Sequence, residues 1–209
     1  MNITHAVEEE IHGDKLEAIF ARQRELMEKY HDIELRSGLL QTEDCPVNLD
    51  DKRGQARIKD FAWRVTEEVG EALDAYYQED EVHFKEELID GLHFLTELTI
   101  LSGCEIKFEG KDALEHLCGL HLSNKKGEIR LMEDVTFLVK ELGMMCNCLK
   151  NKPWKQTNMV TDKDNFYRQL AKVWEIYIGM LSQHMTADEI ASTYLKKSQV
   201  NKFRQRSNY

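Results

Sequence analysis

The sequence predicts an all-α protein built as a helical bundle. Only two of its 209 residues are proline, whereas turn-rich β-sandwiches and proline-rich linkers contain many more. Apolar residues recur every three or four positions along most of the chain, which is the period of an amphipathic helix. A chain of this length can bury a core of its own, so we expect a single domain over residues 1–209.

Six long helices are expected, separated by segments rich in glycine, proline or charge. Their ranges in chain order are 14–35, 56–78, 82–102, 131–150, 163–184 and from about 186 onward. In the third range Leu88, Leu92 and Leu95 repeat at helical spacing, and Gly103 ends it. Pro153 cannot donate the hydrogen bond that a continuing fourth helix would need. Residues 104–130 are expected to be an insertion or connecting segment containing one short helix.

Charge and cysteine content restrict the class of function. The 38 acidic residues outnumber the 28 basic ones, and the net charge of −10 argues against a general nucleic-acid coat protein. Apolar runs are only a few residues long, so no membrane-spanning segment is expected. The N-terminal stretch is acidic, unlike a signal peptide, and five cysteines without a framework spacing indicate reduced thiols. We therefore expect a cytoplasmic protein with no nucleic-acid or membrane partner.

Two pairs of acidic residues stand where the helical pattern calls for apolar side chains. Glu68 falls on the apolar stripe of the second helix, and Glu71 follows one turn later. Glu87 and Asp90 repeat this spacing in the third helix. A short turn between antiparallel helices would bring the four carboxylates together, where they repel unless protonated or bridged by cations, and such hard oxygen ligands favour Mg²⁺. Ordinary solvated acids are the alternative for each pair, because acidic residues are common throughout this chain.

The C-terminal end carries the opposite charge. Its last sixteen residues contain five of the 28 basic residues and no acid. A helix would align Lys197, Asn201 and Arg204 on one face, and Gln205 and Tyr209 follow them. Such a face suits a polyphosphate, which arginine grips through paired hydrogen bonds, although a solvated basic tail has the same composition. A carboxylate-held Mg²⁺ cluster facing a cationic grip is what the cleavage of a phosphoanhydride requires.

These motifs resemble those of the dimeric dUTPases in the all-alpha NTP pyrophosphatase superfamily. The similar segments are EEVGEALDA (67–75), EELIDGLHFLTEL (86–98) and YLKKSQVNKFRQRSNY (194–209). They contain the superfamily's ExxE and ExxD pairs, the LHF sequence after the second pair, and the Lys…Asn…Arg-Gln…Tyr ending. The resemblance implies a four-helix catalytic core, a homodimer, and Mg²⁺-dependent hydrolysis of dUTP to dUMP and pyrophosphate.

The resemblance also assigns a role to each motif residue. Two or more Mg²⁺ ions would be held by Glu68, Glu71, Glu87 and Asp90, and Glu68 would orient and deprotonate the attacking water. The phosphates would be held by Lys197, Asn201, Arg204 and Tyr209. The base and the rest of the substrate would contact Gln23, Lys150, Trp154, Lys155 and Gln205. Lys150, Trp154 and Lys155 come from LKNKPWKQT (149–157), which is similar to a segment of phage and bacterial members.

Two departures from the family's pattern leave the base preference open. The first-helix motif Q..LN keeps its glutamine as Gln23, but Met27 stands at the position of the asparagine. The last motif usually ends in Gly-Tyr, whereas this chain has Asn208 before Tyr209. Hydrolysis of dCTP or of a modified pyrimidine deoxynucleotide is therefore an alternative activity within the same superfamily.

Three other classes of protein are alternatives to this interpretation. A di-iron carboxylate bundle needs two Glu-x-x-His motifs; Glu28 with His31 supplies one, and Asp90 with His93 supplies a substituted second. A zinc site would draw on dispersed thiols and imidazoles without a second paired-ligand motif, namely His116, Cys118, His121, Cys146 and Cys148. The third is a helical protein without enzymatic activity whose basic C-terminal helix binds an acidic partner.

Overall fold

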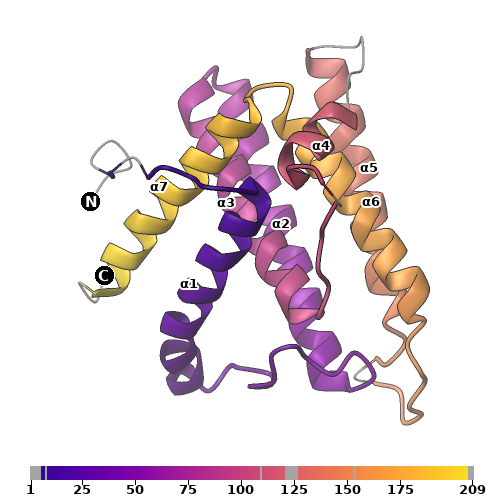
Figure 1. Ribbon diagram of the computed structural model, residues 1–209. Coiled ribbons are helices and arrows are strands. Elements are labelled where there is room, and N and C mark those ends of the chain that lie inside the picture. The colour runs from indigo at the N-terminus through magenta and orange to yellow at the C-terminus, as the bar shows by residue number, and fades with distance from the viewer. Residues whose placement is uncertain (1–5, 8, 109, 121–126, 153, 207–209) are drawn as a thin grey trace.

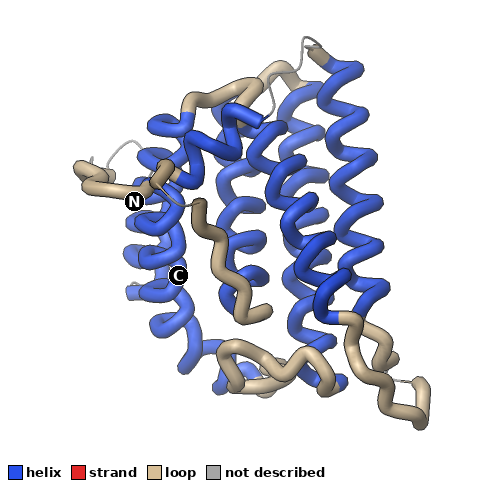
Figure 2. Tube along the Cα trace, turned by 45° about the vertical axis from the view of Figure 1, so that its right-hand side comes forward, coloured by secondary structure: helices blue, strands red, loops and turns tan. Residues whose placement is uncertain are grey.

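The computed structural model describes residues 6–7, 9–108, 110–120, 127–152 and 154–206, with the backbone alone for Gln205 and Arg206. This part of the chain forms seven α-helices and no strand, which confirms the all-α prediction (Figure 1). The helices are α1 (Lys15–Ser37), α2 (Lys52–Tyr77), α3 (Glu81–Leu101), α4 (Ala113–Leu120), α5 (Glu128–Cys148), α6 (Lys163–Leu181) and α7 (Ala187–Arg206). Every described segment between them is a loop or turn (Figure 2).

Aspartate side chains begin several of these helices. Asp14 caps α1 by accepting a hydrogen bond from the Glu17 backbone N–H, and Asp80 and Asp162 cap α3 and α6 in the same way. Asp51 accepts from two backbone N–H groups at the start of α2. This cap explains why α2 begins at Lys52, four residues earlier than the apolar pattern alone predicts.

The helices pack as neighbouring pairs around α3. Helix α2 runs along α3, α5 along α6, and α1 against α7, with the α2–α3 pair between the other two (Figure 1). Helix α3 also contacts α1, α6 and α7, and most of its residues from Leu88 to Leu101 are buried. Helix α4, within the expected connecting segment, buries Leu114 and Leu117 against this core.

One glycine on α3 allows a close approach of α6. A Cβ atom built on Gly91 would lie 2.1 Å from the hydroxyl oxygen of Tyr177. Tyr177 is fully buried and donates a 2.7 Å hydrogen bond to the backbone carbonyl of Leu88. This contact fixes α3 against α6 at the level of Asp90. No helix in the described ranges is both long and apolar enough to cross a membrane.

Candidate active site

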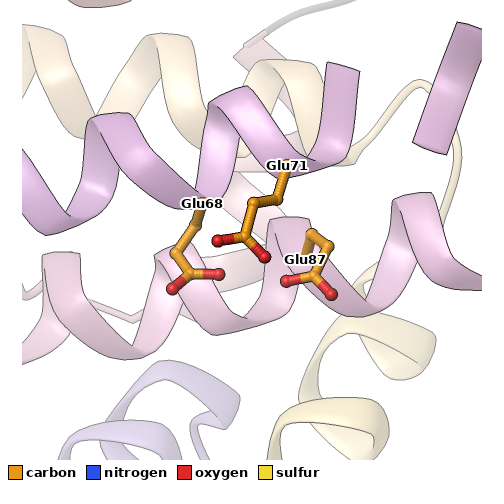
Figure 3. A group of neighbouring side chains, drawn as sticks. All are labelled: Glu68, Glu71 and Glu87. Carbon is orange, nitrogen blue, oxygen red and sulfur yellow. The ribbon is translucent and has the colours of Figure 1, made fainter. Parts of the chain in front are cut away.

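Three glutamates meet where α2 and α3 lie side by side. Glu68 and Glu71 come from α2 and Glu87 comes from α3, and one carboxylate oxygen of each lies within 4.8 Å of the others (Figure 3). The turn at residues 78–80 reverses the chain between the two helices, so two distant ExxE-type pairs face each other. Among the described residues no other group of three or more His, Cys, Asp or Glu gathers in this way.

Crowding and burial oppose the ionisation of Glu68 in this cluster. Burial, the hydrogen bond to Glu87 and the charge of Asp90 together raise the pKa of Glu68 to about 8, with burial the largest of the three causes. Glu87 is buried, Glu68 is half-buried and Glu71 is exposed. His83 Nδ1 lies 3.0 Å from Glu87 on the outer side of the cluster. Carboxylate oxygens that lie this close together fit a hard divalent cation, which would cancel their repulsion.

Asp90, the fourth predicted metal ligand, is paired with a cation of the chain itself. Lys197 Nζ on α7 lies 2.8 Å from Asp90 and 3.6 Å from Glu86. Burial lowers the pKa of Lys197, but these two negative charges outweigh it and the pKa is raised. The structure therefore brings Asp90 and Lys197 together, with Lys197 bound to the acidic face.

A cavity of about 380 Å³ opens directly from the acidic cluster. A separate cavity of about 570 Å³ lies between α1 and the loop that contains Cys45. The walls of the smaller cavity come from α1, α2, α3 and α7, and they include Gln23, Leu26, Tyr30, Glu34, Phe61, Arg64, Glu68, Asp90, His93, Phe94, Glu97 and Asn201. Because α2 and α3 are antiparallel, Glu68 and Asp90 line one end while Phe61 and Glu97 line the other. Seven residues of helix separate Asp90 from Glu97, which corresponds to about 10 Å along the axis.

Gln23 is held rigidly in the wall of this cavity. Its side-chain Nε2 donates a 2.8 Å hydrogen bond to Glu97, and its Oε1 accepts a 2.6 Å bond from the Tyr194 hydroxyl. His93 Nδ1 lies 2.9 Å from the same oxygen and must be the donor there. Both lone pairs of the amide oxygen are thus used, so Gln23 has one N–H left to offer.

His93 is a neutral acceptor in the same wall. Burial, as the main cause, and the charge of Lys197, as the second, lower the pKa of His93 to about 3. The His93 ring stacks on the Tyr194 ring, with 3.7 Å between the two centroids. Because Nδ1 carries the proton, Nε2 has a lone pair, and this buried atom has no hydrogen-bond partner among the described residues. This orientation toward Gln23 does not suit the di-iron alternative, which needs His93 as a metal ligand.

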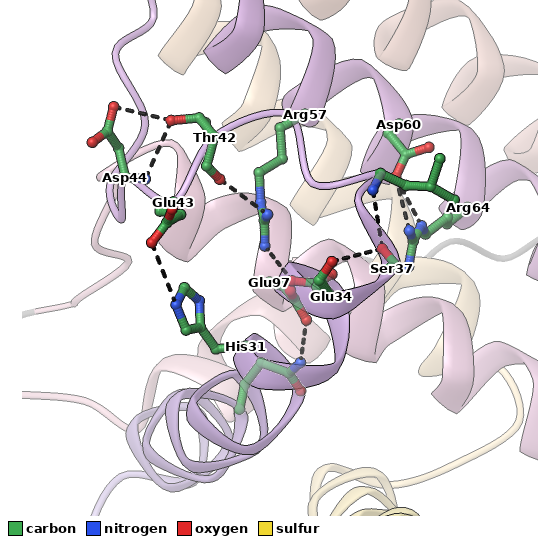
Figure 4. Close-up of polar contacts among 12 residues, drawn as sticks. His31, Glu34, Ser37, Thr42, Glu43, Asp44, Arg57, Asp60, Arg64 and Glu97 are labelled. Carbon is green, nitrogen blue, oxygen red and sulfur yellow. Dashed lines mark hydrogen bonds and ion pairs between the residues drawn. The ribbon is translucent and has the colours of Figure 1, made fainter.

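Aromatic and cationic side chains form the opposite wall. The Arg64 guanidinium lies 4.7 Å from the Phe61 ring centroid and 5.6 Å from that of Phe94. Arg64 is held by Asp60, four residues earlier, while Arg57 binds Glu34 at 2.9 Å (Figure 4). A flat ring placed here would meet two phenyl groups and a stacked guanidinium.

The remaining predicted residues lie at different distances from this cavity. Asn201 lines it, and Arg204 is exposed on the following turn of α7. The side chain of Gln205 and all of Tyr209 fall outside the described residues. Met27 lines the 570 Å³ cavity rather than the one that contains Gln23.

Lys150, Trp154 and Lys155 are not brought to the cavity within this chain. Trp154 is 77% exposed in the loop between α5 and α6. That loop is fixed to the start of α2, since the Asn151 backbone N–H donates to Gln55 Oε1 at 2.9 Å. Gln55 precedes Glu68 by thirteen helical residues, or about 20 Å along α2.

Sequence reasoning missed Glu97, Arg64 and Tyr194 as residues of this site. A signal for Glu97 was present, because it is an acid within the apolar run LHFLTELTIL and lies two helical turns after Asp90. No sequence pattern indicated Tyr194, because its hydrogen bond to Gln23 joins residues near opposite ends of the chain.

Comparison with known proteins identifies the family. Searches of curated proteins and of solved structures found no match. A profile described as dUTPase matches residues 65–209, which is more than half of the chain and includes both acidic pairs and α7. Helix α1 with Gln23 precedes the matched region. The chain belongs to the all-alpha dimeric dUTPase family, whose members are hydrolases acting on nucleoside triphosphates.

Proposed function

We propose that this protein hydrolyses dUTP to dUMP and pyrophosphate in the presence of Mg²⁺. The observation that carries the proposal is the continuity of the acidic cluster with a cavity whose far end contains a fixed amide, Gln23. The two features are separated by about two helical turns. This spacing suits a nucleotide whose phosphates lie at Glu68 and Asp90 and whose base lies between Gln23 and the wall formed by Phe61 and Phe94.

The carboxylates of Glu68, Glu71, Glu87 and Asp90 would hold two or more Mg²⁺ ions. Bound Mg²⁺ supplies charge neutralisation at phosphate oxygens and a lowered pKa for a coordinated water. Glu68 orients the attacking water and accepts its proton, a role that its raised pKa supports. The phosphates are held by Lys197, Asn201, Arg204 and Tyr209. The two cations among them, Lys197 and Arg204, neutralise the negative charge that develops on the leaving pyrophosphate.

The base is held by groups whose hydrogen-bonding capacity the protein leaves unused. The free N–H of Gln23 donates to a uracil carbonyl oxygen, and His93 Nε2 accepts the N3–H group. Arg64 and its two phenylalanine neighbours stack on the ring. A deoxyribose packs between the base and the acidic cluster.

The oligomeric state and location belong to the same proposal. We infer that the chain acts as one domain over residues 1–209, forms a homodimer and works in the cytoplasm, where it removes dUTP and supplies dUMP. Lys150, Trp154 and Lys155 lie outside the cavity of one chain, so any contact of theirs with the substrate would have to come from a partner subunit. Sedimentation of the purified protein tests the dimer.

The activity is tested with a panel of nucleotides. Pyrophosphate release is measured from dUTP, dCTP, dTTP, dATP, dGTP and UTP, each with Mg²⁺ and with EDTA. We expect Mg²⁺-dependent release from dUTP and little from the purine nucleotides. A folded protein that releases pyrophosphate from none of them contradicts the proposal and favours the alternative of a helical partner-binding protein.

A further inference from the structure

The segment that precedes α1 is fastened to α7 by one side chain. Gln199 on α7 pairs with the backbone of Val7, because its Oε1 accepts from the Val7 N–H at 3.0 Å and its Nε2 donates to the Val7 carbonyl at 2.9 Å. The described part of this N-terminal segment comprises Val7 and residues 9–14, and it crosses α7 before it enters α1 (Figure 1). Ile11 packs against the hydrophobic core and anchors the same segment.

Charged side chains extend this attachment to α1. Gln199 Nε2 also donates to a carboxylate oxygen of Glu9 at 2.6 Å, and the Arg22 guanidinium on α1 donates to both oxygens of Glu9. Arg22 Nε lies 3.6 Å from Glu25, which is paired with Lys202 on α7. The contacts therefore form a closed circuit from α7 through the N-terminal segment and α1 back to α7. We call its five residues the clasp, namely Glu9, Arg22, Glu25, Gln199 and Lys202.

The centre of the clasp is the contact between Glu9 and Arg22. Only 15% of the Arg22 side chain and 35% of the Glu9 side chain are exposed. The hydrogen bond from Arg22 is the largest cause that lowers the pKa of Glu9, and the hydrogen bond from Gln199 lowers it further, so Glu9 is ionised at neutral pH. Two parallel, charge-assisted hydrogen bonds are stronger and more directional than an isolated ion pair at the surface.

The clasp lies next to two residues of the proposed site without touching the cavity. Gln199 is midway between Lys197 and Asn201, and residues two apart in a helix point about 200° apart, so Gln199 faces away from the cavity that Asn201 lines. Arg22 immediately precedes Gln23, whose amide is in the cavity wall. None of the five clasp side chains, all of which the structure describes, lines this cavity. The clasp thus joins two helices whose other faces carry Asn201 and Gln23.

We propose that Glu9 and Gln199 are positioning residues that fix α7 on α1 for binding of the triphosphate. They set the separation between Asn201 and Arg204, which we assign to the phosphates, and Gln23, which we assign to the base. The inference rests on the proposed function, which supplies these roles. It also goes beyond the family match, because the N-terminal segment and α1 precede residues 65–209.

The substrate bridges the two helices, so its affinity depends on their separation. Without the clasp, α7 is still held by buried residues such as Tyr194 and Leu195, but the turn that contains Asn201 can move away from α1. The triphosphate must then bring this turn back, which lowers its apparent affinity. Once the substrate is bound, the chemistry at Glu68 on α2 proceeds as before. The loss is therefore expected in KM and not in kcat.

The test compares Glu9→Ala, Gln199→Ala and the double variant with the wild type in kcat and KM for dUTP with Mg²⁺. Alanine favours helix, so α7 is retained. We expect each single variant to raise KM about fivefold or more, with kcat within about twofold of the wild type. The double variant should raise KM no further than the more severe single variant, because both substitutions open the same clasp. Glu10→Ala, which removes an acid of the same segment whose side chain is 85% exposed, is the matched control with an unchanged KM.

Hydrogen exchange provides a readout that does not require turnover. Mass spectrometry follows the backbone amides of α7 from Gln199 onward, together with those of α5 and α6. In Gln199→Ala we expect the α7 amides to exchange about tenfold faster or more, because this turn of the helix opens locally. The amides of α5 and α6 should be unchanged, because the α2–α3 pair lies between these helices and the clasp (Figure 1).

The outcomes separate this inference from the proposed function. An unchanged KM in both single variants shows that the clasp only supports the fold, and the inference is wrong. Effects on KM that multiply in the double variant show that Glu9 and Gln199 act separately, which also overturns it. If the wild type releases pyrophosphate from no nucleotide, the proposed function fails, and hydrogen exchange alone decides the inference. Faster exchange confined to α7 then supports the clasp, and unchanged exchange overturns it.

Discussion

The ammonium group of Lys197 lies 2.8 Å from a carboxylate oxygen of Asp90, and so connects the basic helix α7 to the acidic face of α3. Only 9% of the lysine side chain and 24% of the aspartate side chain are exposed. The same lysine that we assign to the phosphates thus already neutralises a residue that we assign to the metal. This pairing places the two halves of the proposed site, carboxylates and cations, within contact of each other.

Replacing Lys197 by methionine should destabilise the metal-free protein. Asp90 and Glu86 would lose their shared counter-charge in a largely buried setting, and breaking such a pair costs about 2–4 kcal/mol. Urea unfolding at pH 8 in EDTA measures the loss, and Lys172→Met on the exposed face of α6 is the control. A variant as stable as the control would show that the pair contributes nothing to folding.

Stabilisation by Mg²⁺ should increase with pH. The pKa of Glu68 is raised from 4.5 to about 8 in the folded protein, so the folded state holds its proton more tightly than the unfolded state does. The stability from that proton is complete below pH 4.5 and is lost as the pH rises through 8. At pH 6 Glu68 is protonated, so Mg²⁺ must displace its proton in order to bind. At pH 8.5 a large part of the Glu68 carboxyl groups have already lost the proton, so less of it has to be displaced.

The increase in Tm on adding Mg²⁺ is therefore expected to be larger at pH 8.5 than at pH 6. Thermal unfolding with Mg²⁺ or EDTA at both values provides the measurement. Equal increases at the two pH values would mean that Mg²⁺ does not bind at Glu68.

Removing residues 201–209 should weaken binding of the triphosphate. The deletion takes away Asn201, which lines the cavity, and Arg204 on the next turn, while leaving the Lys197–Asp90 pair intact. We expect KM for dUTP to rise about tenfold or more, with cooperative unfolding retained. Unchanged kinetics in the truncated protein would exclude a role for this segment in holding phosphate.

Two glycines in the α2–α3 pair should respond in opposite ways to alanine. At Gly91 an added methyl group would overlap the Tyr177 hydroxyl, so Gly91→Ala should destabilise the fold by about 1–3 kcal/mol. Gly70 on α2 has no neighbour within 4 Å, so Gly70→Ala should stabilise it by up to about 1 kcal/mol. Chemical unfolding of both variants checks the packing of α3 against α6, and a Gly91→Ala protein of wild-type stability would contradict it.

The sequence predicts those parts of the structure that depend on spacing within one helix. Leu88, Leu92 and Leu95 predict α3 because they are buried and their spacing places them on one face of a helix with a 3.6-residue period. Glu68 with Glu71 and Glu87 with Asp90 are each one turn apart, and a single short turn suffices to bring Glu68, Glu71 and Glu87 together.

The end of the cavity that contains Gln23 could not be predicted in this way. Gln23, Glu97 and Tyr194 meet because three helices far apart in sequence pack together, and no local spacing relates them. The placement of Trp154 depends likewise on Asn151, whose side chain and backbone bind the loop to the start of α2. Such contacts are set by tertiary packing, which a pattern of apolar residues leaves undetermined.

The most direct test of the central claim is pyrophosphate release from dUTP by the wild type and by Glu68→Gln, measured side by side with Mg²⁺. We predict Mg²⁺-dependent release by the wild type and a loss of at least about a hundredfold in the variant, because its neutral amide binds the cation more weakly than a carboxylate and cannot accept the proton. The variant should still fold, and its metal-free Tm should be equal or higher, because one of several crowded acids is removed. Full activity in Glu68→Gln, or a variant that is unfolded at ordinary temperature, would contradict the account.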